Sequence, residues 1–125
     1  LVRRLAVGAL ARSASRGEEH VLLRLAERLA DGDAQVRAAA VAAVAEAAAS
    51  GSEDALAIAG THLESDNAET RKAAADALVR AAELGCLGAI AEASSHLQHP
   101  SEPVRLAAID VLVRRQAILG GQAAA

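Results

Sequence analysis

The sequence predicts an all-α protein, an α-solenoid of stacked helical hairpins, and three observations lead to this prediction. Ala fills 35 of the 125 positions, and Phe, Tyr, Trp and Met are all absent. A core without rings has to be built from aliphatic side chains and methyl groups. Such a core suits closely packed helices, whereas strands favour β-branched and aromatic residues. The third observation is an internal repeat with a period of 34 residues.

The repeat consists of like residues that recur at this period. Arg and the Ala three positions after it give the clearest columns, Arg3, Arg37, Arg71 and Arg105 with Ala6, Ala40, Ala74 and Ala108. Leu29, Leu63 and Leu97 align in the other half of the unit. The apolar columns follow i, i+3, i+4, i+7 spacing twice per unit, so each unit is predicted to form two helices. We expect one domain of about 3.5 repeats, approximately 1–34 (beginning with the second helix of a truncated unit), 35–68, 69–102 and a partial 103–125.

Capping residues place the boundaries of seven predicted helices. Asp33, Ser52 and Ser101 are expected N-caps, Asp66 with Glu69 resembles a capping box, and Pro103 fits a first helical turn. The aligned Gly17, Gly51 and Gly85 are expected to end helices in the left-handed conformation. The predicted helices lie near 1–15, 18–30, 33–50, 52–64, 67–84, 86–97 and 101–118, with the tail after Gly120 frayed.

The first seventeen residues allow a second interpretation. They contain four Arg, two Ser and no acid, which is also typical of an organellar transit peptide. Residues 1–16 nevertheless keep the register of the repeat, which favours a repeat helix. Since the sequence begins at Leu1, we expect it to be a processed or partial piece of something longer.

Three stretches resemble the second halves of HEAT repeats, in particular the short HEAT-like repeats of the phycobilin-lyase type. They are LADGDAQVRAAAVAAV, LESDNAETRKAAADAL and LQHPSEPVRLAAIDVL, and LVRRLAVGAL matches the same element truncated at its start. The resemblance therefore covers nearly the whole chain. The chain departs from the pattern at Ser65 and His99, which replace the Asp matched by Asp31, and at Thr70, which replaces Val.

The resemblance implies a structural role for the recurrent Arg. In HEAT-like arrays this residue forms a ladder by reaching an acidic or carbonyl acceptor in an inter-helix turn. Asp31, Asp33 and Asp66 are then the candidate acceptors. The functional alternative is that the aligned Arg3, Arg37, Arg71 and Arg105 bind a phosphate or an acidic peptide.

Charge is divided unevenly between the two helices of each unit. The formal net charge of the chain is −3, with −5 on the predicted first helices and +4 on the second helices. The second helices would line the concave face of a solenoid. Candidate contacts there for an acidic partner are Arg4, Arg12, Lys72, Arg80, Arg114 and Arg115, although ordinary solvated helix faces would give the same pattern.

Few residues suggest chemistry. His96 and His99 supply at most two donors to a metal, and His62 should lie one repeat away, so we expect helix capping and no metal site. Cys86 is expected to be a small apolar filler at a helix start. Sequence motifs for catalysis or for phosphate binding are absent, so we expect no enzyme activity and no cofactor. The missing rings and the acidic balance argue against nucleic-acid binding, and no apolar run approaches the roughly 20 residues that span a bilayer.

The predicted function is a non-catalytic protein–protein interaction scaffold, a fragment of a longer solenoid or a subunit docked in a larger assembly. Its open ends would contact other proteins through Leu1, Val2, Leu5, Val111, Val113, Ile118 and Leu119. One alternative is an accessory structural subunit of a large organellar complex, mitochondrial or photosynthetic. The other is a bilin-lyase-like protein that handles a chromophore. We expect a soluble, intracellular protein that self-associates or is marginally stable alone.

Overall fold

A computed structural model describes the backbone of residues 19–124 and the side chains of residues 22–117. This part of the chain is all-helical, with six α-helices, one 3-10 turn and no strand. The first of the seven predicted helices, near 1–15, lies outside the described residues. The same holds for the predicted contact residues Leu1, Val2, Arg3, Arg4, Leu5 and Arg12. The elements are α2 (Glu19–Glu27), η1 (Arg28–Ala30), α3 (Ala34–Ala49), α4 (Glu53–Leu63), α5 (Ala68–Glu83), α6 (Leu87–Ser94) and α7 (Glu102–Ala124).

Short polar side chains start three of the helices. Asp33 accepts hydrogen bonds from the N–H groups of Gln35 and Val36, and Ser52 accepts one from Ala55, so both predicted N-caps are confirmed. The predicted cap of α5 is wrong. Asn67, and not Asp66, has the extended backbone that precedes α5, and its side chain accepts a hydrogen bond from the N–H of Thr70. Asp66 is one residue too far from the helix to take that position.

Two glycines end helices as predicted. Gly51 and Gly85 have φ values of 103° and 95°, in the left-handed region that residues other than glycine rarely adopt. The N–H groups of the next residues, Ser52 and Cys86, donate to the carbonyls of Ala47 and Ala81 at 3.1 and 2.9 Å. This is the Schellman arrangement, which satisfies carbonyls at the helix end and turns the chain sharply toward the next helix.

The last two helices differ in length from the prediction. α6 ends at Ser94, three residues before the predicted end, and it starts at Cys86 without a side-chain cap. α7 continues through Gly120 and Gly121 to Ala124, past the predicted end. Glycine inside a helix costs only about 1 kcal/mol, and the sequence that follows is rich in Ala and contains no proline, so the helix is not interrupted. None of the helices within residues 19–124 is long and apolar enough to cross a lipid bilayer.

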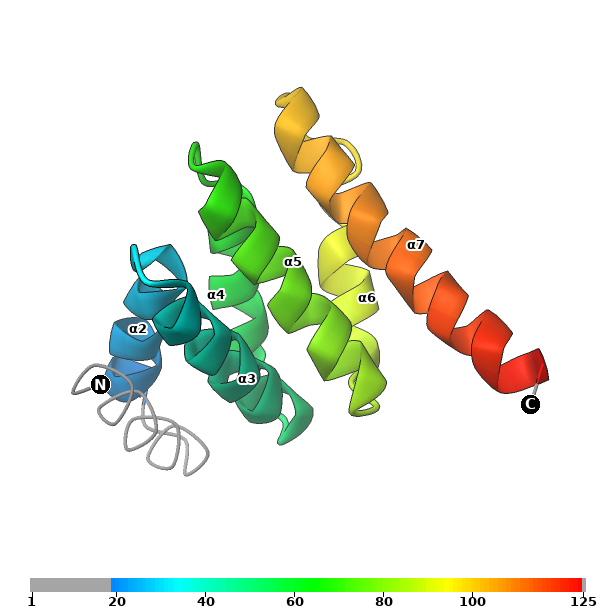
Figure 1. Ribbon diagram of the computed structural model, residues 1–125, viewed down its shortest axis with the longest axis horizontal. Coiled ribbons are helices and arrows are strands. Elements are labelled where there is room, and N and C mark those ends of the chain that lie inside the picture. The colour runs from blue at the N-terminus through cyan, green and yellow to red at the C-terminus, as the bar shows by residue number, and fades with distance from the viewer. Residues whose placement is uncertain (1–18, 125) are drawn as a thin grey trace.

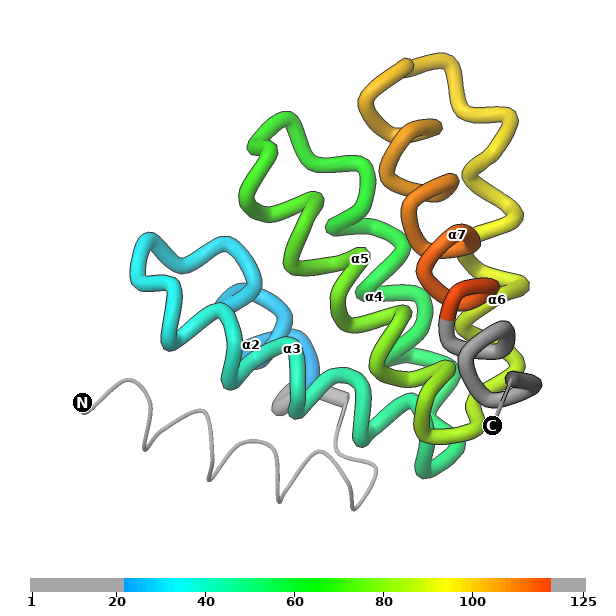
Figure 2. Tube along the Cα trace, turned by 45° about the vertical axis from the view of Figure 1, so that its right-hand side comes forward, coloured from blue at the N-terminus to red at the C-terminus, as the bar shows by residue number. Residues whose placement is uncertain are grey.

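The helices form two layers. α3, α5 and α7 lie side by side in one layer, and α2, α4 and α6 lie behind them in the other (Figure 1). Each rear helix also packs against the front helix that follows it in sequence, which gives the pairs α2 with α3, α4 with α5, and α6 with α7. The tube view shows the same pairs as successive hairpins (Figure 2). α2 and α7 therefore lie at opposite ends of the array.

Alanine dominates the core between the layers. The aligned Ala40, Ala74 and Ala108 are completely buried, and the largest buried side chains around them are Leu and Val. Methyl groups at these positions let neighbouring helices approach closely, which maximises dispersion contacts between backbones. The side chain of Glu92 on α6 lies against α4, because a Cβ added at Gly60 would overlap its carboxylate.

The close approach at Ala74 can be tested by enlarging it. We expect Ala74→Leu to lower the free energy of unfolding by about 1–3 kcal/mol or more, because the added methylenes meet a filled core. Ala57→Leu, at an exposed position of α4, is the matched control and should change stability by less than about 0.5 kcal/mol. Urea denaturation followed by circular dichroism measures both, and equal stability of the two variants would contradict this packing.

Candidate functional site

The recurrent Arg side chains make the same contact in each described unit. Nη1 of Arg37, Arg71 and Arg105 donates to the carbonyl six residues earlier, on Asp31, Ser65 and His99, at 2.8, 2.8 and 2.7 Å. Arg37 and Arg105 donate in addition to the next carbonyl, at 3.1 and 2.9 Å. These carbonyls lie in the turn between the two helices of one hairpin, where the backbone lacks helical partners. The guanidinium therefore closes the turn of its own unit.

The candidate acceptors act differently from what was predicted. Arg37 binds the main-chain oxygen of Asp31. The carboxylate of Asp31 accepts from the N–H of Asp33 at 2.8 Å and lies 3.7 Å from Arg28, while the carboxylate of Asp33 caps α3. Asp66 is exposed, and the hydrogen bond of Arg71 ends on the carbonyl of Ser65. A main-chain acceptor explains why the contact persists where Ser65 and His99 replace the Asp of the repeat.

This contact bears on the alternative role of the Arg residues in phosphate binding. The Nη1 donor of each described Arg is already directed at the main chain, and the side chains are half-buried. Arg37 also has Nη2 at 3.7 Å from the carboxylate of Glu69 on α5, an exposed pair of small energetic weight. The geometry therefore favours the structural role.

Two grooves run between the front helices, and their linings correspond residue by residue. The groove between α3 and α5 has a volume of about 160 Å³ and that between α5 and α7 about 650 Å³. The first is lined by Ala34, Arg37, Ala38, Val41, Glu69, Lys72, Ala73 and Asp76. Moving each position by 34 residues gives eight of the nine residues that line the second, namely Ala68, Arg71, Lys72, Ala75, Pro103, Leu106, Ala107 and Asp110. The same surface thus recurs along the array.

The candidate basic contacts lie among acids on this surface. Lys72 is exposed and lines both grooves, beside Glu69 and Asp76 in one and Asp110 in the other. Arg80 lies 3.6 Å from Glu83. Arg115 is half-buried, and Arg4 and Arg12 are outside the described residues. The front face is therefore mixed in charge within the described residues, and it does not form a continuous basic surface.

Arg114 links the last two front helices. Its Nη1 lies 2.8 Å from Oδ1 of Asp76 on α5. Its Nη2 lies 3.0 Å from Oδ2 of Asp110 on α7, but it is shielded from solvent without good hydrogen-bond geometry, so that contact is electrostatic only. The side chain is 37% exposed, and it is held between two carboxylates.

The outward edge of α7, which we define as Leu106, Ile109 and Val113, is apolar and open. These side chains are 56%, 45% and 59% exposed and follow the i, i+3, i+7 spacing of one helix face. In the preceding unit the positions of Ile109 and Val113 are held by Ala75 and Val79, which are 1% and 5% exposed. The equivalents of Leu106 are exposed, but they are Lys72 and Ala38. Ile109 and Val113 are thus exposed at positions that are covered in the preceding unit, whereas Leu106 is not distinguished in this way.

The predicted open-end residues are only partly right. Val113 lies on the exposed α7 edge, but Val111 was predicted wrongly, because it is completely buried in the core at the position equivalent to Ala77 and Ala43. The side chains of Ile118 and Leu119 lie outside the described residues. Leu106 and Ile109 were missed. Ile109 could have been found by asking which positions of α5 are covered by α7 and moving them by 34 residues, but Leu106 could not, because its equivalent Lys72 is exposed.

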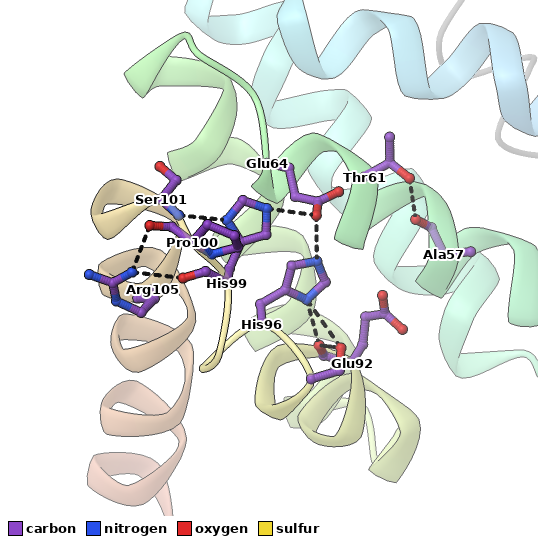
Figure 3. Close-up of polar contacts among 10 residues, drawn as sticks. Ala57, Thr61, Glu64, Glu92, His96, His99, Pro100, Ser101 and Arg105 are labelled. Carbon is purple, nitrogen blue, oxygen red and sulfur yellow. Dashed lines mark hydrogen bonds and ion pairs between the residues drawn. The ribbon is translucent and has the colours of Figure 1, made fainter.

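The histidines form a polar link between hairpins. Figure 3 shows His96 and His99 directed at Glu64, the residue that ends α4. Nε2 of His99 lies 3.0 Å from Oε1 of Glu64, and Nε2 of His96 lies 3.9 Å from the same atom. The N–H of Ser101 donates to Nδ1 of His99, which places the proton of neutral His99 on Nε2, facing the carboxylate.

Helix capping accounts for two further ring contacts. Nδ1 of His96 lies 2.9 Å from the carbonyl of Glu92, and Nδ1 of His62 lies 3.0 Å from that of Ile58, each four residues earlier near a helix end. Cys86 has its sulfur 3.6 Å from the carbonyl of Ala48. Among the residues that the structure describes, no three His, Cys, Asp or Glu side chains are arranged to hold a metal ion.

The contribution of the Arg contact with the turn to the free energy of unfolding can be measured. We expect Arg71→Met to lower the free energy of unfolding by about 1–2 kcal/mol, because the hydrogen bond from Nη1 to Ser65 is charge-assisted and partly shielded from water. Arg80→Met, which removes a more exposed Arg from the same helix, should cost less than about 0.5 kcal/mol. Thermal and urea unfolding of both variants measure the difference, and equal losses would contradict the turn-closing role.

Similarity to known proteins adds no further constraint. No protein-family model, no curated protein sequence and no solved structure matches the chain significantly. The resemblance to HEAT-like repeats therefore stays a prediction from sequence. Geometry alone supports the functional proposal that follows.

Proposed function

We propose that this chain is a HEAT-like α-solenoid module that acts as a non-catalytic protein–protein interaction scaffold, with the α7 edge as its docking surface. One observation carries the proposal. Ile109 and Val113 are exposed at positions where the preceding unit has nearly buried residues. Monomeric proteins rarely expose contiguous apolar patches unless these serve binding. A covering helix would remove this edge from water, at about 25 cal/mol per Å² of apolar surface buried.

Three features support the solenoid part of the proposal. The Arg contact to the turn recurs in each described unit, with nearly equal distances. The grooves between front helices repeat with the same period as the sequence. Among the described front helices, extensive contacts are made only in chain order, by α3 with α5 and by α5 with α7. An array in which each hairpin packs on its neighbours has end surfaces that require a cap or a partner.

The conspicuous polar side chains support a non-catalytic scaffold. Those singled out by the sequence are used in caps, turns and links between hairpins, namely Asp33, Arg37, Arg71, His62, His96, His99 and Arg105. These contacts hold the stacked hairpins in position. Within the described residues, the α7 edge with the groove beside it offers apolar surface to another molecule.

The state of the isolated chain tests the exposed edge. We expect residues 1–125 to self-associate weakly at micromolar concentration, because the α7 edge has no cover. The double variant Ile109→Lys, Val113→Lys should sediment as a monomer with unchanged helicity. The control Leu23→Lys, Leu87→Lys changes two exposed leucines on rear helices and should still associate. Sedimentation velocity measures all three, and a monodisperse, cooperatively folded parent chain would argue against dependence on a partner.

Docking of a native partner tests the function itself. A photoreactive amino acid in place of Val113 should crosslink the protein to a partner in the cells that naturally make it. The same residue in place of Leu87, which is 80% exposed against 59% for Val113 but lies on α6, should not. Ile109→Lys should abolish the crosslink at position 113 without loss of fold. Crosslinking that is equal at both positions, or absent at position 113, would refute the α7 edge as the docking surface.

A further inference from the structure

The two described helices that pack onto a preceding front helix share a pair of side chains. α5 carries Ala73 and Arg80, and α7 carries Ala107 and Arg114, each pair seven residues apart and in register with the other. Ala73 and Ala107 line the grooves that these helices form with the preceding helix. We call the later helix of each packed pair the arriving helix and the earlier one the covered helix. A methyl group at this point lets the arriving helix lie close to the covered helix. A small residue followed by Arg at the seventh position is therefore a feature of the arriving helices.

In one of the two pairs the Arg bridges to the helix it covers, whereas Arg80 of the other pair lies 3.6 Å from Glu83 of its own helix. Arg114 of α7 reaches back to Asp76 of α5, with Nη1 at 2.8 Å from Oδ1. Asp110 stands on α7 at the position equivalent to Asp76 and is 52% exposed. Its ion pair with Arg114 is made within its own helix, through Oδ2. Asp110 therefore occupies, next to the α7 edge, the position from which Asp76 binds an arriving Arg.

We propose that the α7 edge receives a helix of a partner protein that carries a small residue and, seven residues later, an Arg that pairs with Asp110. This inference rests on the proposed function, and it specifies the chemistry of the partner. Leu106, Ile109 and Val113 supply the apolar contact, the small residue allows close approach, and Asp110 fixes the register of the docked helix. A carboxylate and guanidinium that meet beside an apolar contact add specificity as well as attraction.

None of the described front helices of a second copy is suited to this kind of docking. The arriving faces of α5 and α7 are already occupied within the chain. On α3 the matching positions are Ala39 and Glu46. Docking through α3 would therefore bring the carboxylate of Glu46 toward Asp110, and like charges oppose such a contact. The charge at this position therefore disfavours α3 of a second copy as the occupant.

An in-register tandem chain supplies a probe of defined chemistry. Residues 86–119 are repeated directly after Leu119 in place of residues 120–125, so that the second copy of Arg114 follows the first by 34 positions. Both copies carry Cys86→Ser, and Val113→Cys in the first copy reports exposure of the α7 edge to a maleimide. We expect labelling at least about tenfold slower than in the parent chain with the same substitutions, which requires a docked fraction of about 90%.

A mutant cycle isolates the ion pair. Arg114→Met in the second copy should raise the labelling rate severalfold. Asp110→Asn in the first copy should do the same, and the double variant should add little more. Arg115→Met in the second copy is the matched control and should leave labelling slow. Equal labelling of tandem and parent chains, or a tandem chain that does not fold cooperatively, would overturn docking of this kind of helix. If labelling stays slow when the second copy carries Arg114→Met, the role of Asp110 is overturned.

The native crosslink separates this inference from the function on which it rests. The proposed function and the inference are both supported if the segment crosslinked at position 113 is a helix with the small residue and the Arg, and if Asp110→Arg abolishes the crosslink. If the crosslinked segment lacks that pair of residues, or belongs to a second copy of this chain, the inference is refuted, but the α7 edge is still supported as the docking surface. Absence of any specific crosslink at position 113 refutes the proposed function.

Discussion

The architecture depends on how closely its helices approach one another through alanine. A chain without aromatic residues or methionine cannot fill wide spaces between helices, so the helices have to come together until their backbones nearly touch. The fully buried column of Ala40, Ala74 and Ala108 provides that contact in successive front helices. Leu22, Leu25, Leu29, Leu63 and Leu78 then fill the space between the layers. Each leucine can do so only because the alanines have set the spacing.

Close packing of this kind needs hairpins of fixed shape, and the turns provide it. A guanidinium from the second helix of each described hairpin binds the carbonyls at the end of the first helix. The left-handed glycines Gly51 and Gly85 fix the opposite ends, where one hairpin passes to the next. His99 and Glu64 add a link between two hairpins. The rigid units thus present equivalent surfaces, which is why the grooves repeat and why α7 exposes a surface that α5 hides.

Much of this fold can be predicted from the sequence, because the period places equivalent residues in equivalent surroundings. The helical character, the caps at Asp33 and Ser52 and the glycine turns all follow from local rules that need no knowledge of tertiary contacts. Asn67 was missed because Asp66 is an equally good capping residue one position earlier. The sequence allowed either acidic or carbonyl acceptors for the Arg side chains, and it could not show that Ser65 and His99 supply main-chain acceptors, because carbonyls are present at every residue.

The surface was harder to predict than the core. Val111 and Val113 are alike in sequence and two residues apart, but one lies in the core and the other on the α7 edge. Only the position of each on the helix separates them, and the repeat register contains that information. The small residue and Arg shared by α5 and α7 follow from the same register, yet their meaning becomes visible only once Arg114 is seen beside Asp76.

The weakest point of the array follows from the start of α6. This helix has eight residues and no side-chain cap at Cys86, where α4 has Ser52, and only its Ala89 and Ala93 are buried. Local opening of a protein begins where few apolar contacts and few satisfied end groups hold a segment. Amide hydrogens of α6 should therefore exchange with solvent before those of α3 or α5, by motions that leave the front layer intact. α7 would then transiently lose contact with the helix behind it. The rigidity of the α7 edge toward a bound partner would therefore depend on the uncapped first turn of α6.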